Sequence, residues 1–208
     1  MFADLLAHPG VVESHRLAGT VGFMAFHGGN LERVTDLIAT EAADRSDASL
    51  YTVCQPSDLR WHVPSSEFDP AHSPALASFL DHVDVAIAIH GFGRVGFFTT
   101  LLLGGQNRQL ASHVAGHLRP RLAHYEVLDA LDQIPKPLRG IHSANPINRT
   151  RHGGVQIELP PRIRGLTPYW GPAEGTRVPH IDDLIAGLSA AAIAWIQDRP
   201  KTPESGAP

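Results

Sequence analysis

The sequence contains a single cysteine, Cys54, and has no long uninterrupted run of apolar residues. One cysteine cannot form an internal disulfide, and a metal site built from several cysteine thiolates is also excluded. No apolar stretch reaches the roughly 20 residues that a transmembrane helix needs, and residues 1–17 carry charged side chains where a secretion signal has an apolar core. These absences predict a cytoplasmic protein with no membrane partner.

The sequence also lacks a block of basic residues. Its 17 Lys and Arg and 21 Asp and Glu give a formal net charge of −4, and no basic cluster is interleaved with aromatic residues. Nucleic-acid binding depends on such clusters, so we expect no nucleic-acid partner. Histidine, in contrast, is abundant, with thirteen residues along the chain. Most of them fit ordinary solvated or packed roles, so a metal-site hypothesis must depend on position rather than on number.

Two apolar segments end in the same way. Residues 20–26 run directly into His27 and a pair of glycines, and residues 84–89 run directly into His90 and a glycine. Each segment is typical of a buried strand, and glycine allows the backbone to turn sharply after it. In open α/β sheets, ligands bind at the edge where the parallel strands have their carboxyl ends. The sequence therefore predicts two imidazoles at that edge.

The alternation of strand-like and helix-like segments predicts an α/β fold. We expect a single domain over residues 1–198, with a mostly parallel or mixed central sheet flanked by helices, and a disordered tail at 199–208. Asn30 is the expected N-cap of the first long helix. The predicted strands are 20–26, 49–54, 84–89, 97–103 and 154–159, and the predicted helices are 31–42, 74–82, 106–122 (interrupted at Pro120) and 181–196.

His27, Glu32 and His90 are the candidate metal ligands. Catalytic zinc sites use three protein ligands from histidine and carboxylate and leave a fourth position for water. Glu32 is expected in the first turn of the helix after His27, where the helix dipole favours an ionised carboxylate. Each residue also has an ordinary interpretation, as a surface glutamate or a hydrogen-bonded strand-end histidine. The glycines after His27 also fit a phosphate-binding turn.

Glu158 is the candidate general base. In the segment 154–159, Val155, Ile157 and Leu159 alternate with Gln156 and Glu158, so the two polar residues share one face of the strand. Two prolines follow and end the strand, which puts Glu158 near a strand end. A carboxylate there can deprotonate a catalytic water, although a solvent-facing acid on an edge strand fits the same spacing.

Five motifs appear in an order that resembles the phage-type poly-γ-glutamate hydrolases. These enzymes are zinc peptidases with a fold related to that of the carboxypeptidases, and the resemblance extends from about residue 19 to residue 165. The motifs that carry it are Phe26-His27-Gly28-Gly29-Asn30-Leu31-Glu32, Trp61-His62-Val63-Pro64-Ser65, Ile87-Ala88-Ile89-His90-Gly91, Leu103-Gly104-Gly105-Gln106-Asn107, and Asn145-Pro146-Ile147-Asn148-Arg149 leading into Gly154-Val155-Gln156-Ile157-Glu158.

The resemblance implies a zinc-carboxypeptidase-like fold and one Zn²⁺ per chain. It implies that His27, Glu32 and His90 hold the zinc and that Glu158 is the catalytic carboxylate. The wide spacing between His27 and Glu32 is similar to that of this group and differs from the His-x-x-Glu pair of ordinary carboxypeptidases.

The resemblance also points to arginines that bind an anionic substrate. Asn148 and Arg149 are similar to the pair with which zinc carboxypeptidases bind a substrate carboxylate, and Arg149 is an alternative stabiliser of the oxyanion. Arg164 stands where the family tends to have arginine, and Arg94 and Arg151 are expected to extend this set. No acidic residue near Arg149 or Arg151 in the sequence balances their charge, which favours an anionic ligand.

The predicted function is zinc-dependent hydrolysis of amide bonds, with the γ-glutamyl linkages of poly-γ-glutamate or a related polyanion as substrate. The partner is then an anionic peptide-like molecule or a small molecule, and the sequence leaves the oligomeric state open. Two alternatives remain. The same residues fit an amidohydrolase of a small N-acyl or γ-glutamyl compound, and the glycine turn with nearby arginines fits a non-catalytic anion-binding protein.

Overall fold

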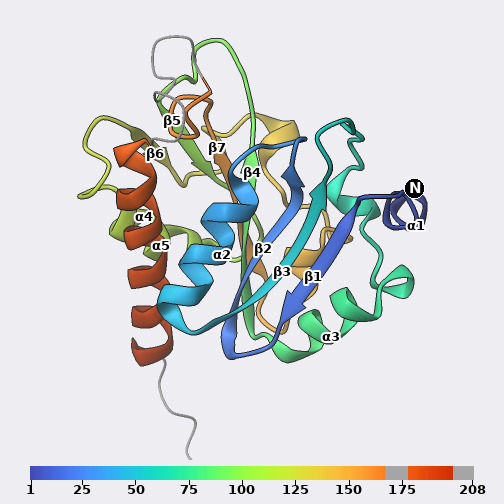
Figure 1. The fold of residues 1–208 in the computed structure, drawn as a ribbon. Coiled ribbons are helices and arrows are strands. Elements are labelled where there is room, and N and C mark those ends of the chain that lie inside the picture. The colour runs from blue at the N-terminus through green and yellow to red at the C-terminus, as the bar shows by residue number, and fades with distance from the viewer. Residues whose placement is uncertain (167–177, 199–208) are drawn as a thin grey trace, which may run out of the picture.

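A single mixed β-sheet organises the computed structural model, which describes residues 1–166 and 178–198 (Figure 1). Within these residues the sheet has seven strands in the order β1-β3-β2-β4-β7-β5-β6. The strands are β1 (Val12–Arg16), β2 (Gly19–Gly29), β3 (Ala48–Gln55), β4 (Val85–Gly91), β5 (Thr100–Leu103), β6 (Glu126–Leu128) and β7 (Gly154–Leu159). The tail predicted at 199–208 lies outside the described residues.

The centre of the sheet is parallel and its margins are not. Strands β3, β2, β4 and β7 run in one direction, because β2 pairs in parallel with β3 and β4, and β4 pairs in parallel with β7. Strand β1 is antiparallel to β3, and β5 is antiparallel to β7 and parallel to β6. The α/β prediction with a mixed sheet is confirmed, and the carboxyl ends of the central strands meet at one edge.

Helices cover the two faces of the sheet unequally. One core cluster joins α2, α4 and α5 to one face, and a second joins α1 and α3 to the other. Within the described residues, no helix combines the length and hydrophobicity needed to cross a bilayer. The helices are α1 (Phe2–Leu6), α2 (Thr35–Ser46), α3 (Pro74–His82), α4 (Arg108–Leu118) and α5 (Pro179–Asp198), and short 3₁₀ turns occur at Ser65–Glu67, Pro70–His72, Lys136–Leu138 and Pro146–Arg149.

The start of α2 differs from the prediction. Asn30 does not cap the helix, because its side chain donates to backbone carbonyls of the segment after β3. Glu32 consequently lies in the turn before the helix rather than in its first turn, and its N–H donates to the His27 carbonyl oxygen at 2.8 Å. The turn ends at Val34, which has a left-handed backbone with φ of 78°. A β-branched residue in that region is strained, so the surrounding contacts must hold this turn in place.

Candidate metal centre

The register of β4 against β7 brings His90 and Glu158 together. The two residues are direct partners in the parallel pairing, at the carboxyl end of both strands. Strand alternation places both side chains on the face of the sheet opposite α2, α4 and α5. Strand β7 lies between β4 and β5, and Glu158 is only 5% exposed. The alternative of a solvent-facing acid on an edge strand is therefore wrong.

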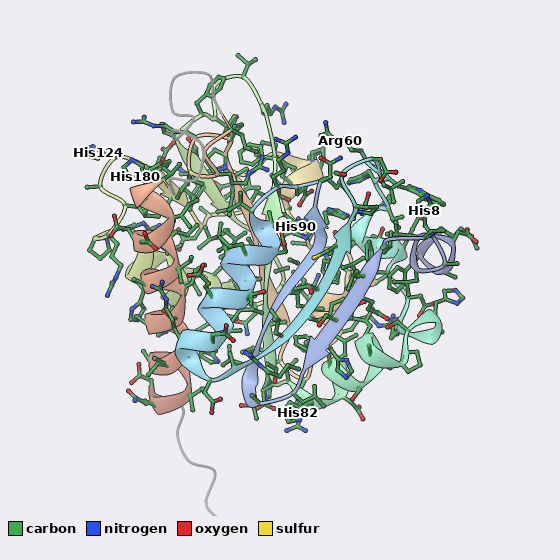
Figure 2. All side chains as sticks on the ribbon, viewed as in Figure 1. His8, Arg60, His82, His90, His124 and His180 are labelled. Carbon is green, nitrogen blue, oxygen red and sulfur yellow. The ribbon has the colours of Figure 1, made fainter. Side chains whose placement is uncertain are left out.

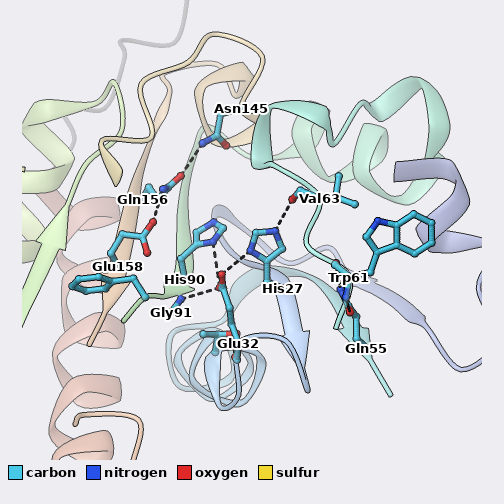
Figure 3. A network of polar contacts seen from close by, with 12 residues as sticks. His27, Glu32, Gln55, Trp61, Val63, His90, Gly91, Asn145, Gln156 and Glu158 are labelled. Carbon is cyan, nitrogen blue, oxygen red and sulfur yellow. Dashed lines mark hydrogen bonds and ion pairs between the residues drawn. The ribbon is translucent and has the colours of Figure 1, made fainter. Parts of the chain in front are cut away.

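Glu32 joins the two histidines from below (Figure 3). Its Oε1 lies 2.8 Å from His27 Nδ1, and its Oε2 lies 3.4 Å from His90 Nδ1. The Gly91 N–H donates to Glu32 Oε2 at 2.8 Å, which fixes the carboxylate between the rings. One ligand atom from each of His27, Glu32 and His90 lies within 4.8 Å of the others. The structure thus brings together all three predicted metal ligands from two stretches of chain, the segment 27–32 and the end of β4.

The hydrogen bonding of His27 fits a cation at this position. His27 Nε2 lies 2.8 Å from the Val63 carbonyl oxygen, which can only accept, so Nε2 carries the hydrogen. In a neutral ring, Nδ1 then presents a lone pair to the Glu32 carboxylate. That contact is favourable only with a proton or a metal ion between the two groups. A histidine whose other nitrogen donates to a carbonyl is a common metal ligand, so the donor set fits a divalent metal.

The pKa shifts of Glu32, His90 and Glu158 are consistent with this donor set. Burial raises the pKa of Glu32, but the charge of His90 and the contacts with both imidazoles outweigh burial and bring that pKa well below its usual range. Burial lowers the pKa of His90, and Glu32 reverses the effect and raises it. The pKa of Glu158 is raised, chiefly by burial, although His90 opposes the shift. Glu32 is thus held as an anion, whereas Glu158 is suited to exchanging a proton.

A chain of two amides orients Glu158 (Figure 3). Gln156 Nε2 donates to Glu158 Oε1 at 2.8 Å, and Asn145 Nδ2 donates to Gln156 Oε1 at 2.8 Å. Because Asn145 donates to the Gln156 oxygen, the Gln156 amine is left to face Glu158. The sequence placed Gln156 on the same face as Glu158 but gave it no role, and nothing in the spacing indicated Asn145.

A cavity of about 590 Å³ opens above these residues. Two long connections supply its walls: the segment between β3 and α3, and the segment between β6 and β7. The His62 ring lies 4.8 Å from the His27 ring between centroids, and burial lowers the His62 pKa, with His27 adding to the shift. The lining comprises His27, Glu32, His62, Pro64, Ser65, Ser66, His90, Gly91, Phe92, Lys136, Pro137, Leu138, Gly140, Ile141, His142, Asn145, Gln156 and Glu158.

The turn after His27 requires glycine at position 29. Gly29 has φ of 68°, and a Cβ there would lie 2.2 Å from the Gln55 carbonyl oxygen. We expect Gly29→Ala to lower the free energy of unfolding by about 2–4 kcal/mol, from left-handed strain together with the backbone clash. Gly96→Ala is the matched control, because Gly96 has φ of 87° but no atom within 4 Å of its Cβ position. Denaturant unfolding should show a clearly smaller loss for Gly96→Ala, and equal losses would contradict the clash.

Arg164 lies beside the candidate metal centre. It is 8% exposed, its Nη2 donates to the Phe92 carbonyl oxygen at 3.1 Å, and a Cβ at Gly91 would lie 2.5 Å from its Cζ. Arg94, in contrast, is exposed on the connection between β4 and β5, and neither arginine is among the lining residues of the 590 Å³ cavity. The structure therefore places Arg164 against Gly91, next to the candidate metal ligands, and leaves Arg94 at the surface.

Asn148, Arg149 and Arg151 do not line this cavity. Asn148 Nδ2 donates to the carbonyl oxygens of two residues of the cavity wall, at 2.8 and 2.9 Å. Arg149 Nη1 lies 3.5 Å from Asp69 Oδ1, and Arg151 Nη1 lies 3.0 Å from Asp84 Oδ1. These two ion pairs show that the interpretation of Arg149 and Arg151 as unbalanced charges is wrong. Asp69 and Asp84 are distant from them in the sequence, so the local spacing does not indicate the pairs. The charge of Arg149 and Arg151 therefore no longer favours an anionic ligand. A substrate-binding role for Asn148, Arg149 and Arg151 stays a prediction.

The centre combines a possible metal-ligand set with a buried carboxylate, and comparison with known proteins identifies the family of the chain. A model of the poly-gamma-glutamate hydrolase family matches residues 4–167. The chain belongs to this family. No curated protein sequence is significantly similar to it. The family membership confirms the resemblance that the sequence motifs indicated and supports a hydrolase.

Several solved structures share the fold of this family member. A bacteriophage poly-gamma-glutamate hydrolase has a TM-score of 0.74 at 20% identity, covering 90% of each chain. A protein described as YNDL-apo, zinc-free, has a TM-score of 0.71 at 18% identity, covering 91% of this chain and 90% of the other. A metallo-carboxypeptidase from Burkholderia cenocepacia has a TM-score of 0.54 at 9% identity, covering 93% and 67%. The predicted carboxypeptidase-like fold is confirmed.

Proposed function

We propose that this protein is a zinc-dependent hydrolase of amide bonds and that γ-glutamyl linkages are its substrate. The observation that carries the proposal is the meeting of His27, Glu32 and His90 with Glu158 beside them on the floor of one cavity. Two imidazoles and a carboxylate are ligands that suit zinc and leave room for water. Membership of the family supports the choice of substrate.

In this proposal each of the chain's own residues has a defined task. When bound, zinc supplies Lewis-acid chemistry, polarising a carbonyl and making water more acidic. Glu158 accepts the proton of the attacking water and returns it to the leaving nitrogen, and Gln156 keeps the carboxylate in the orientation that this requires. The raised pKa of Glu158 helps, because a base with a very low pKa would hold the proton too weakly.

The cavity wall adds groups that suit an anionic substrate. Lys136 lines the cavity on one side, and His62 and His142 add imidazoles. Apart from Glu32 and Glu158, no acidic residue is among the described lining residues. A substrate that carries carboxylates therefore meets a wall without repulsive charge. A small N-acyl or γ-glutamyl compound meets the same groups, so the experiment must include both substrate types.

Metal analysis together with hydrolysis assays tests the proposal. We expect the purified protein to bind about one zinc per chain, to lose amide hydrolysis after chelation, and to regain it when zinc is restored. Poly-γ-glutamate and small N-acyl glutamates are assayed in parallel, with the His124→Ala variant as a control, because His124 is an exposed histidine outside the centre. Metal-free protein that binds anions normally and hydrolyses neither substrate would favour the non-catalytic alternative.

A further inference from the structure

A second cavity adjoins the candidate metal centre. Its volume is about 410 Å³, and it shares Glu32, Gly91 and Phe92 with the 590 Å³ cavity. The two cavities therefore meet along the residues that fix the Glu32 carboxylate. A molecule that lies over the metal ligands and extends past Phe92 would enter this second cavity.

The second cavity is lined by three arginines, Arg33, Arg60 and Arg164. The only acid among its described lining residues is Glu32, and that carboxylate is already engaged by His27 and by the Gly91 N–H. Among the described residues that line it, positive charge is therefore in excess beside the candidate metal centre.

These arginines have unused hydrogen-bonding capacity. Within residues 1–166 and 178–198, Arg33 and Arg60 are exposed and take part in no hydrogen bond or ion pair, and Figure 2 labels Arg60 at the upper rim of the molecule. Arg164 is more than nine-tenths buried, and its Nε has no hydrogen-bond partner in this part of the chain. A buried donor without a partner is costly, so a ligand that accepts from Arg164 would remove that cost.

We propose that the arginines at 33, 60 and 164 form an anion subsite that binds a carboxylate of the substrate residue next to the scissile bond. The proposal rests on the proposed function and specifies how the substrate is recognised. In a γ-linked glutamate chain every residue keeps a free α-carboxylate, so a bond held at the metal centre has such a group nearby. A guanidinium binds a carboxylate through two parallel hydrogen bonds, which gives this subsite a preference for carboxylate over a neutral amide.

Binding measurements in a non-hydrolysing background test the subsite. The Glu158→Gln protein, loaded with zinc, is titrated with a short γ-glutamyl oligomer and with the same oligomer carrying α-carboxamides. Adding Arg33→Gln and Arg60→Gln together should weaken binding of the carboxylate oligomer by roughly tenfold, as expected for two partly exposed ion pairs. Binding of the carboxamide oligomer should change much less. Arg45→Gln, at the far end of α2, is the charge-matched control.

The outcomes separate the subsite from the hydrolase proposal. Equal affinity of the carboxylate oligomer for the double variant and for Arg45→Gln would overturn the subsite, even if the protein with Glu158 intact cleaves the polymer. An equal loss for both oligomers would also overturn it, because charge would then play no part. If the selective loss is seen but no polymer is cleaved by the protein with Glu158 intact, the hydrolase proposal fails and the anion subsite stands.

Discussion

Glu158→Gln is expected to lower amide hydrolysis by about a thousandfold while the protein keeps its zinc. Glutamine has nearly the same shape but cannot accept the proton, and a positioned general base contributes about 10²–10⁴ in rate. Gln156 donates to the carboxylate oxygen at 2.8 Å in the native protein, and the amide oxygen of the variant can accept in its place. Folding should therefore be preserved. Steady-state kinetics and metal content, measured on the same preparation, check this result.

Glu126→Gln provides the matched control for that substitution. Glu126 is an exposed glutamate on β6 and is absent from the lining of the 590 Å³ cavity, so its variant should retain nearly full activity. Hydrolysis by Glu158→Gln at the native rate would remove Glu158 from the mechanism. A loss of zinc in Glu158→Gln would instead assign this residue to holding the metal.

His90→Ala is expected to have the second large effect, loss of both zinc binding and turnover. His90 is 3% exposed and lies against Glu32, so its removal takes away one of the three proposed ligands and leaves a buried carboxylate with less compensation. His27→Ala should behave in the same way. We expect zinc content to fall to near zero in both variants at protein concentrations where the native chain is saturated. Atomic absorption and a zinc titration provide the measurements.

A thermal readout distinguishes loss of the ligand from loss of the fold. In the native protein, added zinc should raise the melting temperature, because a ligand that binds only the folded state stabilises it. In His90→Ala that increase should disappear while a cooperative transition remains, and His124→Ala should respond as the native protein does. An undiminished zinc-dependent increase in His90→Ala would contradict the proposed ligand set.

The sequence predicts elements best where a proline marks one end of a segment and apolar residues recur at a clear spacing within it. Strand β7 and helix α3 have the predicted limits, because prolines bound both segments and apolar residues recur at the spacing of each element. Strand β1 was missed because it is an exposed edge strand in which no side chain is fully buried. Strand β6 and helix α1 were missed because three and five residues are too few to establish a period.

Part of the candidate site could also be predicted from the sequence, and part could not. His27, His90 and Glu158 stand at the ends of strong apolar strands, so their meeting follows from parallel topology alone. Long-range partners cannot be derived in that way. The contacts of Arg149 with Asp69 and of Asn145 with Gln156 depend on how irregular segments fold over the sheet. The acidic partners of Arg149 and Arg151 could not be predicted from the sequence for the same reason, because they come from distant segments.

The amide chain behind Glu158 limits how the cavity of this protein can be remodelled. Asn145 belongs to the long connection between β6 and β7, which also forms one wall of the cavity. Replacing that connection with one from a relative, to alter substrate range, would also disturb the orientation of Glu158 unless an amide at the same place is transplanted with it. The opposite wall, between β3 and α3, is constrained by the Val63 carbonyl that fixes the His27 tautomer. Neither wall is therefore an independent module for redesign.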